Sequence, residues 1–267
     1  MKSDSQLDAI KLVLFMALML LIVEMSPILT SFFSGDMYLL VGTMAFFATF
    51  LFMYIAIEGF VKWDGKTITS LGIDFDDSTI PQIVIGAIAG TLAAAVVVAI
   101  AYFYGAALRP FAQINADLIA SEILITTPTA LFEELAHRGY ILPHMEGLFG
   151  KPVAILLSSV FFSFLHFSWW TYPGVTVQLI LIFSFNMFLG GVVLALSYYW
   201  SGRHLWVPIA FHFAWNMLAY ILFPSFPNEP VLMPAVFQIE WGVTTIIGFL
   251  IGLSLLYGLL NSKRNRK

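Results

Sequence analysis

Eight long apolar runs constrain the fold of this chain more than any other feature. A helix that spans a bilayer needs about 20 mostly apolar residues. Runs of roughly that length recur along the 267 residues, at 10–30, 37–60, 82–104, 117–142, 152–170, 176–200, 205–223 and 236–260. A backbone embedded in lipid must satisfy its own hydrogen bonds, so such runs fold as helices. The sequence therefore predicts an all-α polytopic membrane protein, a bundle of about eight transmembrane helices.

Composition excludes a soluble protein and narrows the chemistry. Only 10% of the residues are charged and 60% are hydrophobic, whereas a soluble domain carries roughly 25% charged residues. The chain has no cysteine, which excludes disulfides, thiolate catalysis and cysteine-ligated metals. The first apolar run is longer than a signal-peptide core and no small-residue cleavage site follows it, so we interpret it as a retained span.

The basic residues predict an orientation. Eight spans place both termini on one side, together with eleven of the twelve Lys and Arg residues, and leave Arg109 alone on the other. Because basic loops stay in the cytoplasm, we expect cytoplasmic N- and C-termini in a multi-pass protein of the cell membrane. A compact chain of this kind is typical of a prokaryotic plasma membrane. The segment 61–81 is the one clearly polar loop, so we interpret 1–267 as a single membrane domain.

The fourth predicted span carries charged side chains, which are costly in a membrane and therefore indicate function. Residues four apart share a helix face, so Glu134 can pair with Arg138 while Glu133 aligns with His137. Two adjacent glutamates point about 100° apart. One can therefore face a cavity while the other is tied to Arg138. We expect His137 to lie near the basic cytoplasmic end rather than to bind a metal.

Two later spans carry isolated polar residues. His166 lies among apolar residues and is costly unless it faces the same cavity. His212 and Asn216 are four residues apart and form one polar stripe. Three helices thus aim a carboxylate, two imidazoles and an amide at one point, and these residues define a motif-bearing core at about 117–223. The sequence predicts a buried polar site there.

This residue set suits hydrolysis of a peptide bond. Glu133 beside histidines can act as a general base on water. The imidazoles of His166 and His212 could instead hold a metal ion that acidifies its bound water. Asn216 can donate a hydrogen bond to a developing oxyanion. The chain contains neither a Gly-x-Ser-x-Gly elbow nor a His-Glu-x-x-His zinc helix.

The predicted span ends put the site residues at unequal depths. At 1.5 Å per residue, Glu133 and His212 lie about 15 and 14 Å from the basic side, and His166 lies about 21 Å from it. Either the span 152–170 tilts strongly, or it begins below the surface while 147–152 extends into solvent.

Three motifs occur in order on these spans. They are Glu-Glu-x-x-x-Arg at 133–138, Phe-x-x-x-His at 162–166 and His-x-x-x-Asn at 212–216. Together they resemble the motifs of the CPBP intramembrane proteases, also called the Abi or CAAX-protease family, to which the eukaryotic Ras-converting CAAX endopeptidase belongs. The resemblance covers residues 133–216, and the eight-span plan is similar as well.

The resemblance implies a set of catalytic residues, namely Glu133, His166, His212 and Asn216. It makes Glu134 and Arg138 the supporting pair. It implies an endopeptidase, open toward the cytoplasm, that acts on a lipid-anchored (CAAX-like) or membrane-associated peptide or protein. Two mechanisms are compatible with it: a metal-free one in which Glu133, with His166 beside it, activates water, or one that uses a divalent metal such as zinc bound by Glu133, His166 and His212. The cofactor therefore stays open.

The same residues are compatible with two other interpretations. The polar stripes could serve only as hydrogen bonds between helices, and the chain could be a non-proteolytic membrane scaffold or a bacteriocin-immunity-type protein. The one basic run, at 263–267, is interpreted as a solvated cytoplasmic tail, so no nucleic-acid partner is expected. Gly86 and Gly90 predict a close helix contact, and Trp169 with Trp170 predicts an anchor at the membrane interface.

Overall fold

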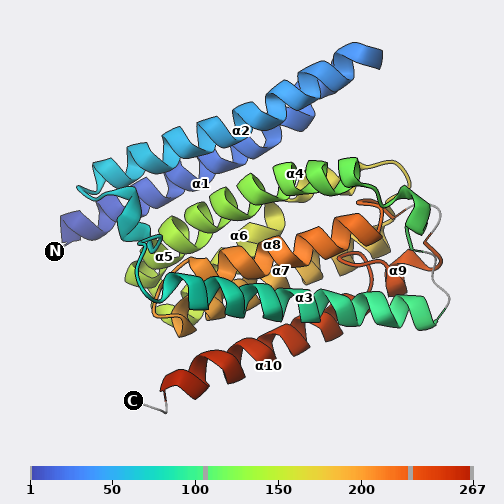
Figure 1. Cartoon of the computed structure of the whole chain (residues 1–267). Coiled ribbons are helices and arrows are strands. Elements are labelled where there is room, and N and C mark those ends of the chain that lie inside the picture. Colours follow the sequence, from blue (N-terminus) through green and yellow to red (C-terminus); the bar gives the residue numbers. More distant parts are fainter. Residues whose placement is uncertain (1, 105–107, 228–230, 265–267) are drawn as a thin grey trace.

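The computed structural model describes residues 2–104, 108–227 and 231–264, and within them it contains helices and connecting turns but no strand (Figure 1). The helices are α1 (Lys2–Thr30), α2 (Gly35–Trp63), α3 (Thr79–Phe103), α4 (Ala116–Glu134), α5 (Leu142–Phe149), α6 (Lys151–Phe164), α7 (Val177–Trp200), α8 (Trp206–Leu222), α9 (Pro234–Phe237) and α10 (Thr244–Arg264). A π-helix (Leu135–Ile141) joins α4 to α5, and 3₁₀ turns lie at Ile68–Leu71, Phe111–Gln113 and Phe167–Thr171. The predicted all-α fold is confirmed.

Several of these helices are long and apolar enough to cross a membrane. In the described part of the chain, six qualify by length and composition: Ser5–Thr30, Gly35–Trp63, Thr79–Phe103, Lys151–Thr171, Val177–Trp200 and Thr244–Asn261. The shorter apolar helix α8 and the polar-interrupted α4 correspond to the two remaining predicted spans. The chain is a multi-pass helical membrane protein. Its last predicted span, 236–260, is divided, because α9 is followed by a turn and α10 begins only at Thr244.

The helical path of the fourth span continues past Pro143, whereas the apolar run predicts an end at residue 142. A proline removes one donor from the helical ladder and its ring crowds the preceding turn. Here it lies in the first turn of α5, directly after the π-helix Leu135–Ile141. A π-turn shifts the hydrogen bonds by one residue, so the path can accept a proline without ending. The path extends to Phe149.

This continuation removes the discrepancy in depth between Glu133 and His166. Glu133 precedes the end of α5 at Phe149 by 149 − 133 = 16 residues, and His166 follows the start of α6 at Lys151 by 166 − 151 = 15 residues. Gly150, at φ 79°, makes the sharp turn between the two helices. Nearly equal lengths on the two sides of one turn bring both side chains to a similar level. For these two residues, neither a strong tilt nor a buried start of the span is required, whereas His212 follows the start of α8 by only 212 − 206 = 6 residues.

The contact between α3 and α8 depends on two glycines. A Cβ atom at Gly86 or Gly90 would collide with the backbone carbonyl oxygens of Val207 and Phe211, respectively. The predicted small-residue contact is therefore confirmed, and its partner is the helix that carries His212. This close packing fixes the position of α8 and, with it, one wall of the site.

The C-terminal end of α8 is capped by a side chain distant in sequence. The Arg109 guanidinium donates to the backbone carbonyl oxygens of Tyr220 at 3.1 Å, Ile221 at 3.0 Å and Phe223 at 3.2 Å. A cation suits the negative end of a helix dipole and its unsatisfied carbonyls. Arg109, the one basic residue predicted on the side away from the other eleven, thus has a structural role at the end of α8.

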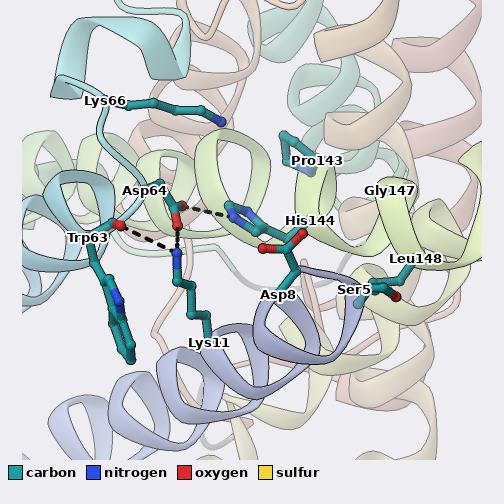
Figure 2. A pocket seen from close by; sticks show the side chains of 10 residues that line it. All are labelled: Ser5, Asp8, Lys11, Trp63, Asp64, Lys66, Pro143, His144, Gly147 and Leu148. Atoms are coloured by element: carbon teal, nitrogen blue, oxygen red, sulfur yellow. Dashed lines mark hydrogen bonds and ion pairs between the residues drawn. The ribbon is translucent and has the colours of Figure 1, made fainter. Parts of the chain in front are cut away.

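The α1–α2 hairpin lies along one side of the remaining helices (Figure 1). A polar cluster joins it to α5 beside a cavity of about 440 Å³ (Figure 2). Lys11 Nζ lies 2.6 Å from Asp64 Oδ1, and His144 Nε2 lies 2.9 Å from Asp64 Oδ2. Asp64 therefore connects α1, the end of α2 and α5. Burial raises the pKa of the Asp64 carboxyl, but the hydrogen bond from Lys11 and the nearby His144 and Lys11 charges outweigh that effect, and the pKa lies below its ordinary value.

The depressed pKa of Asp64 predicts a pH-dependent contribution to stability. Because the folded pKa is below the unfolded one, the stabilisation is present at neutral pH and is lost as the pH falls through the folded pKa. Asp64→Asn should lower the free energy of unfolding at pH 7 by about 1–3 kcal/mol, the cost of removing one partner. Thermal unfolding in detergent should show this difference from wild type shrinking below about pH 4. Asp77→Asn, an exposed control, should behave as wild type at every pH, and a difference that persists at low pH would contradict the assignment.

The glycine contact generates a second prediction. Gly90→Leu should push α8 away from α3, lower the free energy of unfolding by about 1–3 kcal/mol and impair any activity that needs His212. Thermal unfolding in detergent measures the first effect. Gly59→Leu is the matched control, since no atom lies within 4 Å of the added Cβ. Equal effects of the two substitutions would show that the α3–α8 contact is not special.

Candidate functional site

The predicted site residues line one cavity. Its volume is about 1210 Å³, and its walls come from α1, α2, α4, α6, α7, α8 and the turn before α10. The four side chains implied as catalytic all line it: Glu133, His166, His212 and Asn216. Glu133 comes from the last turn of α4, His166 from just beyond α6, and the other two from α8. The structure brings together residues separated by up to 83 positions (216 − 133).

His212 lies between the two adjacent glutamates. Its Nδ1 is 3.1 Å from Glu134 Oε1, and its Nε2 is 3.9 Å from Glu133 Oε2. Since a carboxylate only accepts, Glu134 fixes the Nδ1–H tautomer in a neutral ring and turns Nε2 toward Glu133. Glu133 Oε2 has no hydrogen-bond partner among the described residues. The two glutamates thus differ in role although they are neighbours in sequence.

The Glu134–Arg138 pair is buried within the bundle. Arg138 Nη1 donates to Glu134 Oε1 at 2.8 Å, and its Nη2 donates to the Gly191 carbonyl of α7 at 3.1 Å. The exposed fractions of the two side chains are 0% for Glu134 and 2% for Arg138. Because Glu134 also holds His212, the pair connects α4, α7 and α8. The predicted pairing is observed, and the two side chains also form hydrogen bonds with two other helices.

Phe162 lies at the centre of the polar residues. Its ring centroid is 5.0 Å from that of His166, 5.0 Å from that of His137 and 6.2 Å from that of His212. The Arg138 guanidinium carbon is 4.6 Å from the same ring, a cation–π geometry. The Phe162 carbonyl accepts a hydrogen bond from His166 Nδ1 at 2.9 Å, so Nε2 of a neutral His166 keeps its lone pair. The phenylalanine of the Phe-x-x-x-His motif therefore orients the histidine through both its ring and its backbone.

His137 differs from the sequence-based expectation. It is only 2% exposed and lines the cavity instead of lying near the surface. Its Nδ1 donates to the Glu133 carbonyl at 2.9 Å, and its Nε2 has no partner among the described residues. The expectation was wrong because it depends on a helix that ends near Pro143. Continuation to Phe149 places His137 well inside the bundle.

A metal centre does not fit the geometry of these side chains. Among the described residues, no three His, Cys, Asp or Glu side chains are arranged to hold a metal ion. The set considered from the sequence, Glu133, His166 and His212, therefore does not form one here.

Glu240 and Tyr220 are site residues that the sequence motifs did not indicate. Both line the cavity, and the Tyr220 hydroxyl lies 3.4 and 3.3 Å from the two carboxylate oxygens of Glu240. Glu240 lies in the turn before α10. The apolar run 236–260 predicts one uninterrupted span there and gives no sign of this turn. Tyr220 is four residues beyond Asn216, and that helical spacing is the one available signal.

One end of the cavity lies at the end of the bundle away from the basic residues, and the cavity is also exposed along α2 and α4. The exposed rim residues at that end come from the α1–α2 turn, the first turns of α2, and the 3₁₀ turn Phe167–Thr171 with the residues after it: Ser31, Tyr38, Leu39, Thr171, Tyr172 and Pro173. Exposed lining residues farther along the two helices are Thr43, Phe47, Leu124 and Ile125. Figure 1 shows the α1–α2 turn at the end opposite the start of α1 and the end of α10. Trp169, predicted as an interfacial anchor, lines this part of the cavity and stacks on Phe183 with centroids 5.5 Å apart.

Fold and site together define a polytopic helical membrane protein with a buried cluster of glutamate and histidine. Residues 115–218 match the family model described as type II CAAX prenyl endopeptidase Rce1-like. The matched segment contains all three motifs, and the match supports the resemblance of this part of the chain to the CPBP, or CAAX-protease, family of membrane-embedded peptidases. No match was found among curated proteins or solved structures.

The two glutamates should differ in their effect on stability. Glu134→Gln removes the charge partner of buried Arg138 and should lower the free energy of unfolding by about 3–5 kcal/mol. Glu133→Gln, the matched control, removes no hydrogen bond that the structure describes and should cost less than about 1 kcal/mol. Thermal or denaturant unfolding in detergent measures both. Equal losses would show that the pair does not support the fold as described.

Proposed function

We propose that the chain is an intramembrane endopeptidase that hydrolyses a peptide bond in a lipid-anchored (CAAX-like) or membrane-associated peptide or protein. The observation that carries this proposal is the environment of Glu133. Its Oε2 has no partner among the described residues and lies 3.9 Å from His212 Nε2, and the residue lines a large cavity. A carboxylate oxygen that accepts no hydrogen bond keeps its lone pair available for a water proton. Glu133 is therefore the general base.

The remaining side chains supply orientation and charge stabilisation. His166, with Nδ1 bound to the Phe162 carbonyl, offers Nε2 as an acceptor that holds the attacking water together with Glu133. The water oxygen bonds to the substrate carbonyl carbon as its proton passes to Glu133. Glu133 then returns this proton to the amide nitrogen as the C–N bond breaks. Asn216 donates a hydrogen bond to the oxyanion formed between these steps.

His212 is held ready for the same intermediate. Glu134 fixes its Nδ1 side and is itself fixed by Arg138, so the imidazole needs little reorganisation during the reaction. In its protonated form, Nε2 can donate to the oxyanion beside Asn216. Preorganised donors of this kind commonly contribute the largest single share of catalysis. Glu134 and Arg138 act through His212 and are positioning residues.

The rim supports a particular route for the substrate. If the basic end faces the cytoplasm, as positive-inside statistics predict, both termini are cytoplasmic and the cavity opens away from the cytoplasm. The sequence-based expectation of a cytoplasmic opening would then be wrong. Exposed apolar side chains of α2 and α4, such as Leu39 and Leu124, border the same cavity. The route therefore suits a substrate that is already in the membrane.

Cleavage of a fluorogenic lipidated peptide ending in a CAAX sequence, in detergent, tests the proposal. Wild type should cleave it, and Glu133→Gln should reduce kcat by at least about 100-fold, the usual scale for losing a general base. Glu58→Gln, the same change at an acid outside the cavity, should retain full activity. A parallel sample with a chelator decides the cofactor: retained activity indicates a glutamate mechanism without a labile metal, and lost activity indicates a metalloenzyme.

Two results would contradict the proposal. Undiminished cleavage by Glu133→Gln would remove Glu133 from the mechanism. If wild type cleaved neither lipidated peptides nor unlipidated membrane peptides, while a cellular phenotype survived Glu133→Gln, a non-proteolytic scaffold or immunity-type role would replace it.

A further inference from the structure

The cavity that contains the proposed catalytic residues has an acidic lining. Its carboxylates belong to Glu122, Glu133 and Glu240, and no Lys or Arg is among the described residues that line it. The nearby Arg138 and Arg109 are engaged with buried partners. The cavity therefore favours a substrate that is cationic or rich in N–H donors near these acids.

Glu240 lines this cavity from a turn with an unusual backbone conformation. Its backbone is left-handed, at φ 68°, a conformation that is strained for a residue other than glycine. Two buried side chains hold it there. Asn186 Nδ2 donates to the Glu240 carbonyl at 2.8 Å and to the Gly242 carbonyl at 3.0 Å, and the Glu240 N–H donates to Thr245 Oγ1 at 2.8 Å. These hydrogen bonds thus hold one strained residue whose side chain lines the cavity.

The Glu240 carboxylate has no cationic partner in the described part of the chain. The residue is 4% exposed, and its side chain interacts with the neutral Tyr220 hydroxyl at 3.3–3.4 Å. A buried acid without a cation is costly. His137 also lines the cavity, and its buried Nε2 likewise lacks a partner among the described residues. Both groups are suited to receive a polar ligand.

Helix geometry places Glu240 relative to the reacting atoms. His212, Asn216 and Tyr220 follow at intervals of four residues and share one face of α8. Four residues of helix rise about 6 Å, which corresponds to about two residues of extended peptide. Glu240, held by Tyr220, therefore lies about two substrate residues from the carbonyl that Asn216 would contact.

We propose that Glu240 is a specificity-determining residue that binds a lysine or arginine side chain of the substrate close to the scissile bond. This inference rests on the proposed function and narrows its substrate class to basic, membrane-associated peptides. A cation at this place would pair with the buried carboxylate and favour its ionised form. An acidic side chain there would meet like charge and be disfavoured.

A charge series on one cleavable peptide tests the inference. The parent is a neutral, internally quenched membrane peptide that wild type cleaves and Glu133→Gln does not. Each of three positions on either side of the scissile bond is replaced in turn by Lys, Leu or Glu. At one position, the kcat/KM of the Lys peptide should exceed that of the Glu peptide by at least about tenfold.

Variants then locate the preference. Glu240→Gln should reduce it to within about threefold, chiefly by raising KM for the Lys peptide, because a uniform binding interaction is lost. Glu58→Gln is the matched control and should keep the preference. Thermal unfolding shows whether Glu240→Gln is folded. If it is not, Glu240→Asp, which retains the charge but withdraws it by one methylene, takes its place and should weaken the same preference.

The outcomes separate this inference from the proposed function. Failure of wild type to cleave any parent peptide would count against the peptidase itself. Cleavage without a charge preference, or a preference that survives in folded Glu240 variants, would overturn the role of Glu240 while leaving the peptidase intact.

Discussion

The buried pairing of Glu134 with Arg138 is the interaction on which the rest of the site depends. Arg138 reaches the Gly191 carbonyl of α7, and Glu134 reaches His212 of α8. A charge inside a bundle is costly unless it is paired, and here the partners of Glu134 Oε1 and of the Arg138 guanidinium come from three helices. The pair therefore sets the relative position of the helices and fixes the imidazole that faces Glu133. Stability and proposed chemistry share one network.

Close packing of small residues supplies the other constraint. Gly86 and Gly90 of α3 admit the backbone of α8, and without a hydrophobic driving force in lipid such contacts hold helices together. The α1–α2 hairpin is attached differently, through the polar cluster around Asp64 near the basic end. At the other end it borders the cavity. The firmly packed helices thus carry the polar residues, and the hairpin forms a wall that the substrate would pass.

Two acids at the cavity show how local strain and function are connected. Glu133 follows from a motif on a regular helix, where periodicity makes its direction readable. Glu240 is itself a left-handed residue, held by Asn186 and Thr245. No local sequence pattern predicts such a turn. The proposed base was therefore predictable, whereas the proposed specificity residue was visible only in three dimensions.

The sequence by itself determined the helical membrane fold, the approximate spans, the pairing of Glu134 with Arg138 and the identity of the polar residues in the three motifs, because hydropathy and helical periodicity are local properties. Tertiary structure decided what depends on helix ends and contacts: the continuation through Pro143, the burial of His137 and the end of α6 before His166. It also decided the place of His212 between two glutamates. These features follow from packing between distant segments, whose distances and angles no local pattern encodes.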